Sequence, residues 1–198
     1  MNLNRRLGVS ALLCGLAAPL AGSPYRQLRG PVDVQDIAKV VMEGGDHVDA
    51  LTLAAWIRDR IPGLRVIDVR SPDEIHGFAL PTAENLPLDV LLRTAFDASE
   101  VLVLYSEGGA HAGQAWTLLR AMGVRNAYFI AGGLADWHEE VLFPVLSSKA
   151  SDAEAKAFEA TAELSRYFGG TPTIGERPAP MHGRAARRPA SQARRRGC

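Results

Sequence analysis

The sequence predicts an α/β fold, a small parallel β-sheet with helices on both faces. Short apolar, β-branched runs alternate along the chain with longer segments whose apolar residues recur at helical spacing. The most hydrophobic run, Val101-Leu102-Val103-Leu104-Tyr105, is typical of a buried central strand. Each intervening helix carries the chain back across a face of the sheet, so that successive strands run parallel.

Helices are predicted where apolar residues share one face and a capping residue, proline or glycine marks an end. They cover residues 34–42, 51–60, 88–93, 112–122, a segment containing Leu134, Trp137 and Val141, and residues 152–168. Asp49 or Asp46 caps the second helix, and Ser71 and Glu74 are spaced to cap a short turn that starts at Pro72. Strands are predicted at residues 65–69, 83–86, 101–105 and 126–130.

Composition divides the chain into five segments. These are a signal peptide or N-terminal anchor at 1–23, a linker and N-terminal helix at 24–45, a folded domain at 46–146, a C-terminal helix at 147–170, and a disordered basic tail at 171–198. The formal net charge is zero, but residues 23–175 carry a net −8 and residues 176–198 a net +6. The seven tail arginines suit an anionic surface, and the lack of aromatic residues among them argues against specific nucleic-acid recognition.

The first 23 residues are typical of an export signal. Arg5 and Arg6 precede an apolar stretch of 15 residues at 7–21, which is shorter than the ~20 residues of a membrane span. We therefore expect an exported protein that is periplasmic, or anchored by an uncleaved leader and facing the periplasm. The chain has two cysteines, Cys14 and Cys198, so cleavage would leave a single thiol at the last residue.

The candidate site follows the central strand directly. Its sequence is Ser106-Glu107-Gly108-Gly109-Ala110-His111. A strand, a glycine-bearing loop and a helix N-terminus together form a cradle of backbone N–H groups that suits an anion. The hydrolase motif Gly-x-Ser-x-Gly lacks its first glycine here, and the histidines His76, His111 and His138 show no metal-ligand spacing. We expect neither a metal nor a cofactor.

Three motifs give the domain a family resemblance. They are Ile67-Asp68-Val69-Arg70 followed by Glu74, the stretch 78–87 with Pro81, Ala83, Asn85 and Pro87, and Gly132-Gly133 followed by Trp137. In this order and spacing they resemble a single rhodanese domain, which implies the rhodanese-like fold over residues 46–146. The resemblance also implies that Asp68 and Arg70 shape the site. In that family the loop is Cys-x-x-Gly-x-Arg, so this chain keeps Gly109 but has Ser106 at the nucleophile position and His111 at the arginine position.

The serine limits the chemistry that the loop can perform. Sulfur transfer needs a thiolate that holds a sulfane sulfur as a persulfide, and a serine hydroxyl without an adjacent base cannot do this. We therefore expect a sulfurtransferase-like pseudoenzyme that binds a small anion, a sulfane-sulfur compound or a protein thiol, although the charge of Glu107 disfavours thiosulfate. Two alternatives stay open. Cys198, whose thiolate Arg194-Arg195-Arg196 would favour, could carry the sulfur, or the basic tail could recruit a partner to a scaffold.

Overall fold

The computed structural model describes residues 33–75 and 77–176. They form two compact units, one ending at Val141 and one beginning at Leu142, and each is described by itself. Within the described ranges no helix is both long and apolar enough to cross a membrane. The proposed leader at 1–23, most of the basic tail and Cys198 lie outside the described residues.

The first unit contains a parallel sheet of five strands in the order β1-β5-β4-β2-β3. The strands are β1 His47–Val48, β2 Leu64–Asp68, β3 Glu84–Asn85, β4 Val101–Tyr105 and β5 Ala127–Ile130. β4 lies at the centre, as its hydrophobicity predicts, and its residues 102–105 are buried. The carboxyl ends of β2 and β4 are neighbours, because Asp68 is paired with Tyr105 in the register of the sheet.

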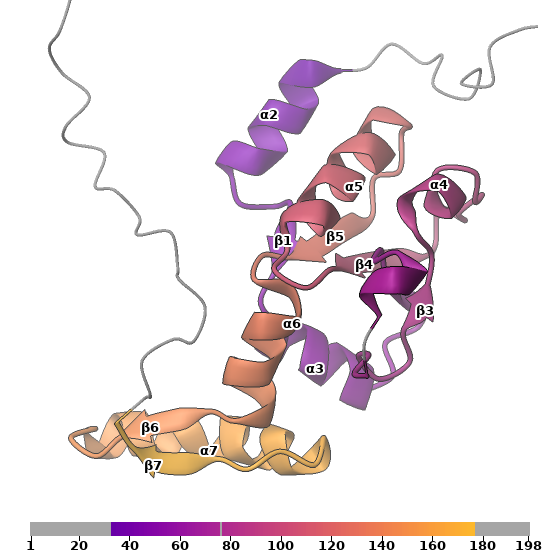
Figure 1. The fold of residues 1–198 in the computed structure, drawn as a ribbon. Helices are drawn as coiled ribbons and strands as arrows, with labels where there is room; N and C mark the ends of the chain where they lie inside the picture. Colours follow the sequence, from indigo (N-terminus) through magenta and orange to yellow (C-terminus); the bar gives the residue numbers. More distant parts are fainter. Residues whose placement is uncertain (1–32, 76, 177–198) are drawn as a thin grey trace, which may run out of the picture. The chain divides into compact units, whose positions relative to one another are not determined.

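Helices cover both faces of this sheet (Figure 1). They are α2 Val34–Met42, α3 Ala50–Arg58, α4 Leu88–Leu91, α5 Ala110–Ala121 and α6 Gly133–Asp136, with a 3₁₀-helix η2 at Pro72–Glu74 and a π-helix η3 at Trp137–Leu142. Leu102 and Leu104 of β4 join the core cluster with Trp116 of α5. On the opposite face, Trp56 of α3 packs against Tyr128 of β5 with ring centroids 6.3 Å apart.

The N-terminal helix α2 belongs to the first unit. Its residues Ile37 and Val40 pack against the core cluster, and Asp36 accepts a hydrogen bond of 2.7 Å from Arg120 of α5. The sequence grouped this helix with a linker, outside the folded domain. Strand β1 was not predicted, because two residues at the edge of a sheet carry no periodic pattern.

The second unit contains strand β6 Val145–Ser147, helix α7 Asp152–Tyr167 and strand β7 Thr173–Gly175. The two strands pair in parallel, with Val145 opposite Thr173. A reciprocal cap begins α7, because Glu154 accepts from the backbone N–H of Ser151 at 2.8 Å and donates its own N–H to the Ser151 hydroxyl at 3.4 Å.

The prediction of a disordered tail from residue 171 was wrong for its first residues. β7 lies within that segment, and the Thr171 N–H donates to the Leu142 carbonyl at 2.7 Å. Composition predicted disorder because this segment can bury little apolar surface. Strand β6 nevertheless orders it by supplying backbone hydrogen-bond partners to β7.

Candidate functional site

The loop at residues 106–109 connects β4 to α5 and depends on glycine. Gly109 has φ +82°, and a Cβ built at this position would overlap the carbonyl oxygen of Ala131. Gly133 has φ +61°, and a Cβ there would overlap the carbonyl oxygen of Ser106. Leu134 donates its N–H to that Ser106 carbonyl at 3.0 Å. Gly109 and Gly133 therefore hold the loop by close backbone approach, which no larger residue permits.

Ser106 is the first residue of this loop and is 2% exposed. Its hydroxyl oxygen accepts a hydrogen bond of 3.3 Å from the N–H of Ala112. Among the described residues, the backbone N–H groups of residues 107–111 have no acceptor. These amides and the positive end of the helix dipole of α5 form the cradle that the sequence predicts.

A small open pocket of about 120 Å³ lies over the cradle. It is lined by Arg70, Glu74 and the loop residues 106–108, 110 and 111. The predicted loop residues Ser106, Glu107, Gly108, Ala110 and His111 thus come together around one pocket, and Gly109 supports it from behind.

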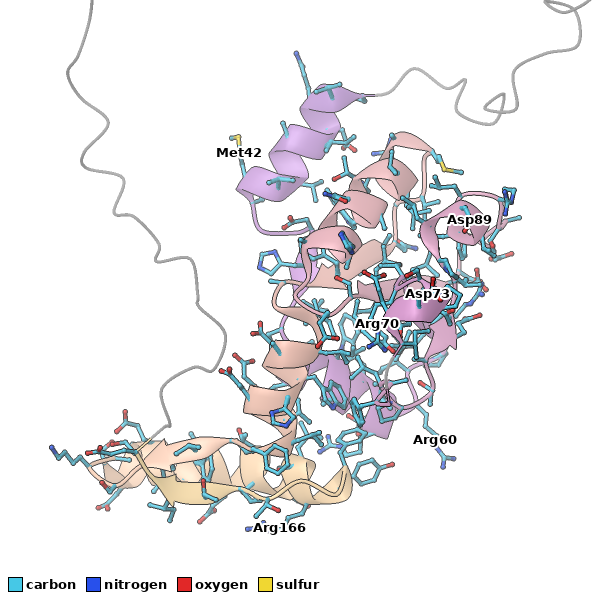
Figure 2. The ribbon with its side chains drawn as sticks, in the orientation of Figure 1. Met42, Arg60, Arg70, Asp73, Asp89 and Arg166 are labelled. Atoms are coloured by element: carbon cyan, nitrogen blue, oxygen red, sulfur yellow. The ribbon has the colours of Figure 1, made fainter. Side chains whose placement is uncertain are left out.

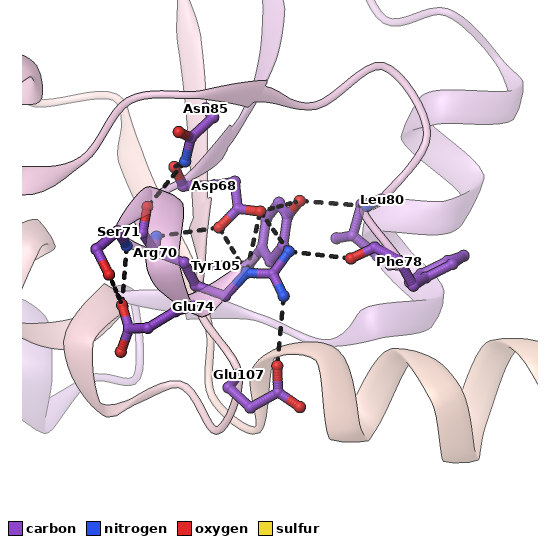
Figure 3. A network of polar contacts seen from close by, with 9 residues as sticks. All are labelled: Asp68, Arg70, Ser71, Glu74, Phe78, Leu80, Asn85, Tyr105 and Glu107. Carbon is purple, nitrogen blue, oxygen red and sulfur yellow. Dashed lines mark hydrogen bonds and ion pairs between the residues drawn. The ribbon is translucent and has the colours of Figure 1, made fainter. Parts of the chain in front are cut away.

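Asp68 and Arg70 form a buried ion pair beside the pocket (Figure 3). The guanidinium of Arg70 donates to Asp68 through Nε at 2.9 Å and Nη2 at 2.6 Å, and the Arg70 backbone N–H adds a bond of 3.0 Å. The hydrogen bonds that the Arg70 side chain donates to Asp68 raise the pKa of Arg70. The sequence predicts both residues as supports of the site. Arg70 reaches the pocket, whereas Asp68 lies behind it and orients the guanidinium.

Tyr105 extends this network to the segment before β3. Its hydroxyl donates to Asp68 Oδ2 at 2.9 Å and accepts the N–H of Leu80 at 3.2 Å. Burial raises the pKa of Tyr105 to about 12, so the hydroxyl keeps its proton under ordinary conditions. Arg70 Nη2 also donates to the carbonyl of Phe78 at 3.0 Å, which ties the same segment to the site.

Asn85 holds the end of β2 in place. Its side-chain amide donates to the carbonyls of Asp68 at 3.0 Å and Arg70 at 2.9 Å. The sequence marked Asn85 only as part of a motif and did not assign a role to Tyr105. The order and register of the strands could have indicated both roles, because neighbouring parallel strands bring their carboxyl ends to one edge of the sheet.

Two carboxylates stand at the rim of the pocket. Glu107 is 81% exposed, and its Oε2 lies 3.4 Å from Arg70 Nη1. Glu74 Oε2 accepts from the N–H and hydroxyl of Ser71 at 2.8 and 2.9 Å, and these bonds lower the pKa of Glu74. Its other oxygen lies 3.9 Å from His111 Nδ1. The sequence assigned Glu74 to a cap and a motif but not to the pocket.

The pocket offers hydrogen-bonding and charged groups. Ser106 has no side-chain base as a hydrogen-bond partner among the described residues, and the imidazole of His111 faces Glu74. Within residues 33–75 and 77–176 no group of three or more His, Cys, Asp or Glu side chains is arranged to hold a metal ion.

A family model supports the resemblance. The model of the rhodanese-like domain matches residues 53–140, within the predicted range 46–146. Residues 53–140 match the rhodanese-like domain, and the central parallel sheet of the first unit with its surrounding helices matches the rhodanese fold. No curated protein matches the chain.

Solved structures with this fold are similar over about half of the chain. The Alr3790 protein from Anabaena sp. is 27% identical, with 46% of this chain and 74% of that chain covered and a TM-score of 0.42. The solution structure of the rhodanese-like domain of the same protein is 26% identical, with 46% and 71% covered and a TM-score of 0.39. The human single-domain sulfurtransferase TSTD1 is 25% identical, with 46% and 93% covered and a TM-score of 0.40.

Proposed function

We propose that the protein is exported and that its rhodanese-like domain binds an anion, a sulfur compound or a protein thiol rather than performing standard sulfur transfer. The observation that carries the proposal is Ser106 at the nucleophile position of an otherwise formed loop. The cradle amides, Arg70 and the glycines that hold the loop are all present. A site that keeps its binding groups and lacks a thiol retains binding and loses the covalent step.

The chemistry of that step explains why serine cannot replace cysteine. In sulfur transfer the thiolate attacks the sulfane sulfur of thiosulfate, sulfite leaves, and cyanide then removes the sulfur as thiocyanate and regenerates the thiolate. A hydroxyl needs a neighbouring base to form the corresponding nucleophile. Ser106 instead accepts a hydrogen bond from Ala112, and an oxygen analogue of the persulfide would not serve as a stable carrier.

A thiosulfate:cyanide sulfurtransferase assay on the full chain tests the proposal. We expect no thiocyanate above background from the wild type and a gain of activity in Ser106→Cys. Ser148→Cys places a thiol at an exposed position in the second unit and controls for non-specific thiol chemistry. Binding of thiosulfate and sulfate, followed by the NMR shifts of the amides at 107–111, tests the cradle directly. Absence of binding by every anion tried would overturn the proposal.

The same assay discriminates the alternative in which Cys198 carries the sulfur. That alternative requires an active wild type and a silent Cys198→Ala variant. Activity in both would refute the alternative and the binding proposal together. Cys198 lies outside the described residues, and the arginines at 194–196 are the sequence feature that favours its thiolate.

Export and partner recruitment have separate tests. The mass of the secreted or periplasmic chain reports whether a leader near residue 23 is removed, and an intact mass in the cytoplasm would contradict export. For a scaffold that recruits partners through the tail, deletion should begin at residue 177. Deletion from 171 would also remove β7, which pairs with β6. Unchanged partner retention after this deletion would exclude the scaffold alternative.

A further inference from the structure

The charge of the pocket is negative although its cradle suits an anion. The guanidinium of Arg70 is 3% exposed and is balanced by Asp68, so this buried pair adds no net charge. Glu74 and Glu107 then leave the rim with an excess of negative charge, because Arg70, which also contacts Glu107 at 3.4 Å, is already balanced by Asp68. A simple dianion that enters the cradle would therefore approach two carboxylates as well as the amides.

Each rim carboxylate has an oxygen free for a ligand. Oε2 of Glu74 is occupied by the N–H and hydroxyl of Ser71, whereas Oε1 is 3.9 Å from His111 Nδ1, beyond hydrogen-bond distance. Oε2 of Glu107 faces Arg70, and its Oε1 has no hydrogen-bond partner among the described residues. The pocket thus offers two acceptors at its rim.

The floor of the pocket offers donors. The N–H groups of residues 107–111 have no acceptor among the described residues, and the hydroxyl oxygen of Ser106 already accepts from Ala112, which leaves its proton for a ligand. Arg70 Nη1 adds a donor whose one described contact is the 3.4 Å approach to Glu107. Donors at the floor and acceptors at the rim are complementary to a ligand with separated charges of opposite sign.

We infer that the ligand of this pocket is a small zwitterion, whose anionic sulfur or oxo group lies on the loop amides and whose ammonium group lies between Glu74 and Glu107. This inference rests on the proposed binding function and names its ligand class. Aminoalkyl sulfur compounds with a terminal sulfonate, thiosulfonate or thiolate have this chemistry. The rim carboxylates then favour the ligand, whereas the same groups repel thiosulfate and sulfate.

A matched pair of probes tests the inference on the full chain. Taurine and ethanesulfonate share the sulfonate and differ in the ammonium group. Titrations at about pH 8, where histidine side chains are generally neutral, should give taurine at least about fivefold tighter binding than ethanesulfonate. The shifts should centre on the amides of residues 107–111, and the preference should shrink at high salt.

Charge-neutral variants locate the preference. Glu74→Gln and Glu107→Gln should each reduce taurine affinity about threefold and leave ethanesulfonate unchanged or tighter. Asp73→Asn is the control, because Asp73 lies in the same η2 turn, is exposed and does not line the pocket (Figure 2). The control should not change the ratio of the two affinities.

The outcomes separate this inference from the function on which it rests. Equal affinities for the two sulfonates, tighter ethanesulfonate, or binding of thiosulfate alone would overturn the zwitterion and leave an anion-binding loop. A taurine preference that survives both glutamine variants would also overturn it. Failure of thiosulfate, sulfate and both sulfonates to bind would overturn the proposed function as well.

Discussion

Replacement of Asp68 should destabilise the domain more than any single exposed ion pair can. Asp68 is buried, and its carboxylate accepts hydrogen bonds from the backbone N–H and guanidinium of Arg70 and from the hydroxyl of Tyr105. Asp68→Asn keeps the shape of the side chain but removes its charge. The guanidinium of Arg70, which is 3% exposed, then loses the carboxylate that balances it. Removal of one partner of a buried pair costs about 3–5 kcal/mol.

The expected loss is a large part of the stability of a domain, which is typically about 5–15 kcal/mol. Urea unfolding of the full chain measures this loss, followed by tryptophan fluorescence, to which the buried Trp116 contributes. The matched control is Asp89→Asn, since Asp89 of α4 (Figure 2) also pairs with an arginine, Arg93, at 2.8 Å, but both side chains are exposed. Its cost should be at most about 0.5 kcal/mol.

A double variant separates the ion pair from a general loss of packing. Once Asp68 is neutral, removal of the cation in Arg70→Gln relieves the uncompensated charge, so the double variant should cost less than the sum of the two single variants by at least about 1 kcal/mol. A cost for Asp68→Asn equal to that of Asp89→Asn, or additive single costs, would refute the assignment of Asp68 as the counter-charge of Arg70.

Three other predictions concern the support of the site. Gly109→Ala should cost at least about 2 kcal/mol in urea unfolding and Gly123→Ala only about 1, because both have positive φ but only Gly109 lies against a backbone oxygen. Burial raises the pKa of the Tyr105 phenol from 10 to about 12, so the stability of the wild type relative to Tyr105→Phe is constant below pH 10 and falls by about 2 kcal/mol as pH rises to 12; parallel alkaline profiles would contradict this. Asn85→Ala should cost about 2 kcal/mol by losing two hydrogen bonds, to the carbonyls of Asp68 and Arg70, and a neutral result in thermal unfolding would exclude that role.

The sequence was sufficient for the elements whose apolar spacing or capping residues give a strong signal. β4 and α2 have the predicted bounds, and α7 differs from its prediction by one residue at its end. β4 is apolar and is buried at residues 102–105, and α7 has an N-terminal cap that its sequence displays directly. A strand was predicted at 83–86, where β3 occupies 84–85, whereas the edge strand β1 and the pair β6 and β7, two or three residues long, were not predicted. Backbone pairing with distant segments holds such strands, and local patterns do not report it.

The candidate site was predicted in its loop, which includes Glu107, but Glu74 at the rim was not predicted as part of it. Ser106 and the residues after it are contiguous, so the motif alone groups them. Glu74 lies 32 positions before Ser106 and reaches the pocket because β2 and β4 are neighbours and η2 follows β2 directly. The Tyr105–Asp68 bond spans 37 residues and likewise depends on the sheet order. The negative rim, and with it the ligand class, becomes apparent only when these contacts are known.

Most of the contacts that hold the loop do not involve the side chain at position 106. Backbone groups hold the loop, through the Leu134 N–H on the Ser106 carbonyl and the passage of Gly109 beside Ala131. The Ser106 side chain contributes one hydrogen bond, from Ala112, and a thiolate in its place would accept from the same group. A nucleophile can therefore be absent from this position while the cradle persists. It follows that a folded Ser106→Cys variant without sulfurtransferase activity would point to the charge of Glu74 and Glu107 as the obstacle to thiosulfate, and their glutamine variants in that background would identify which carboxylate is responsible.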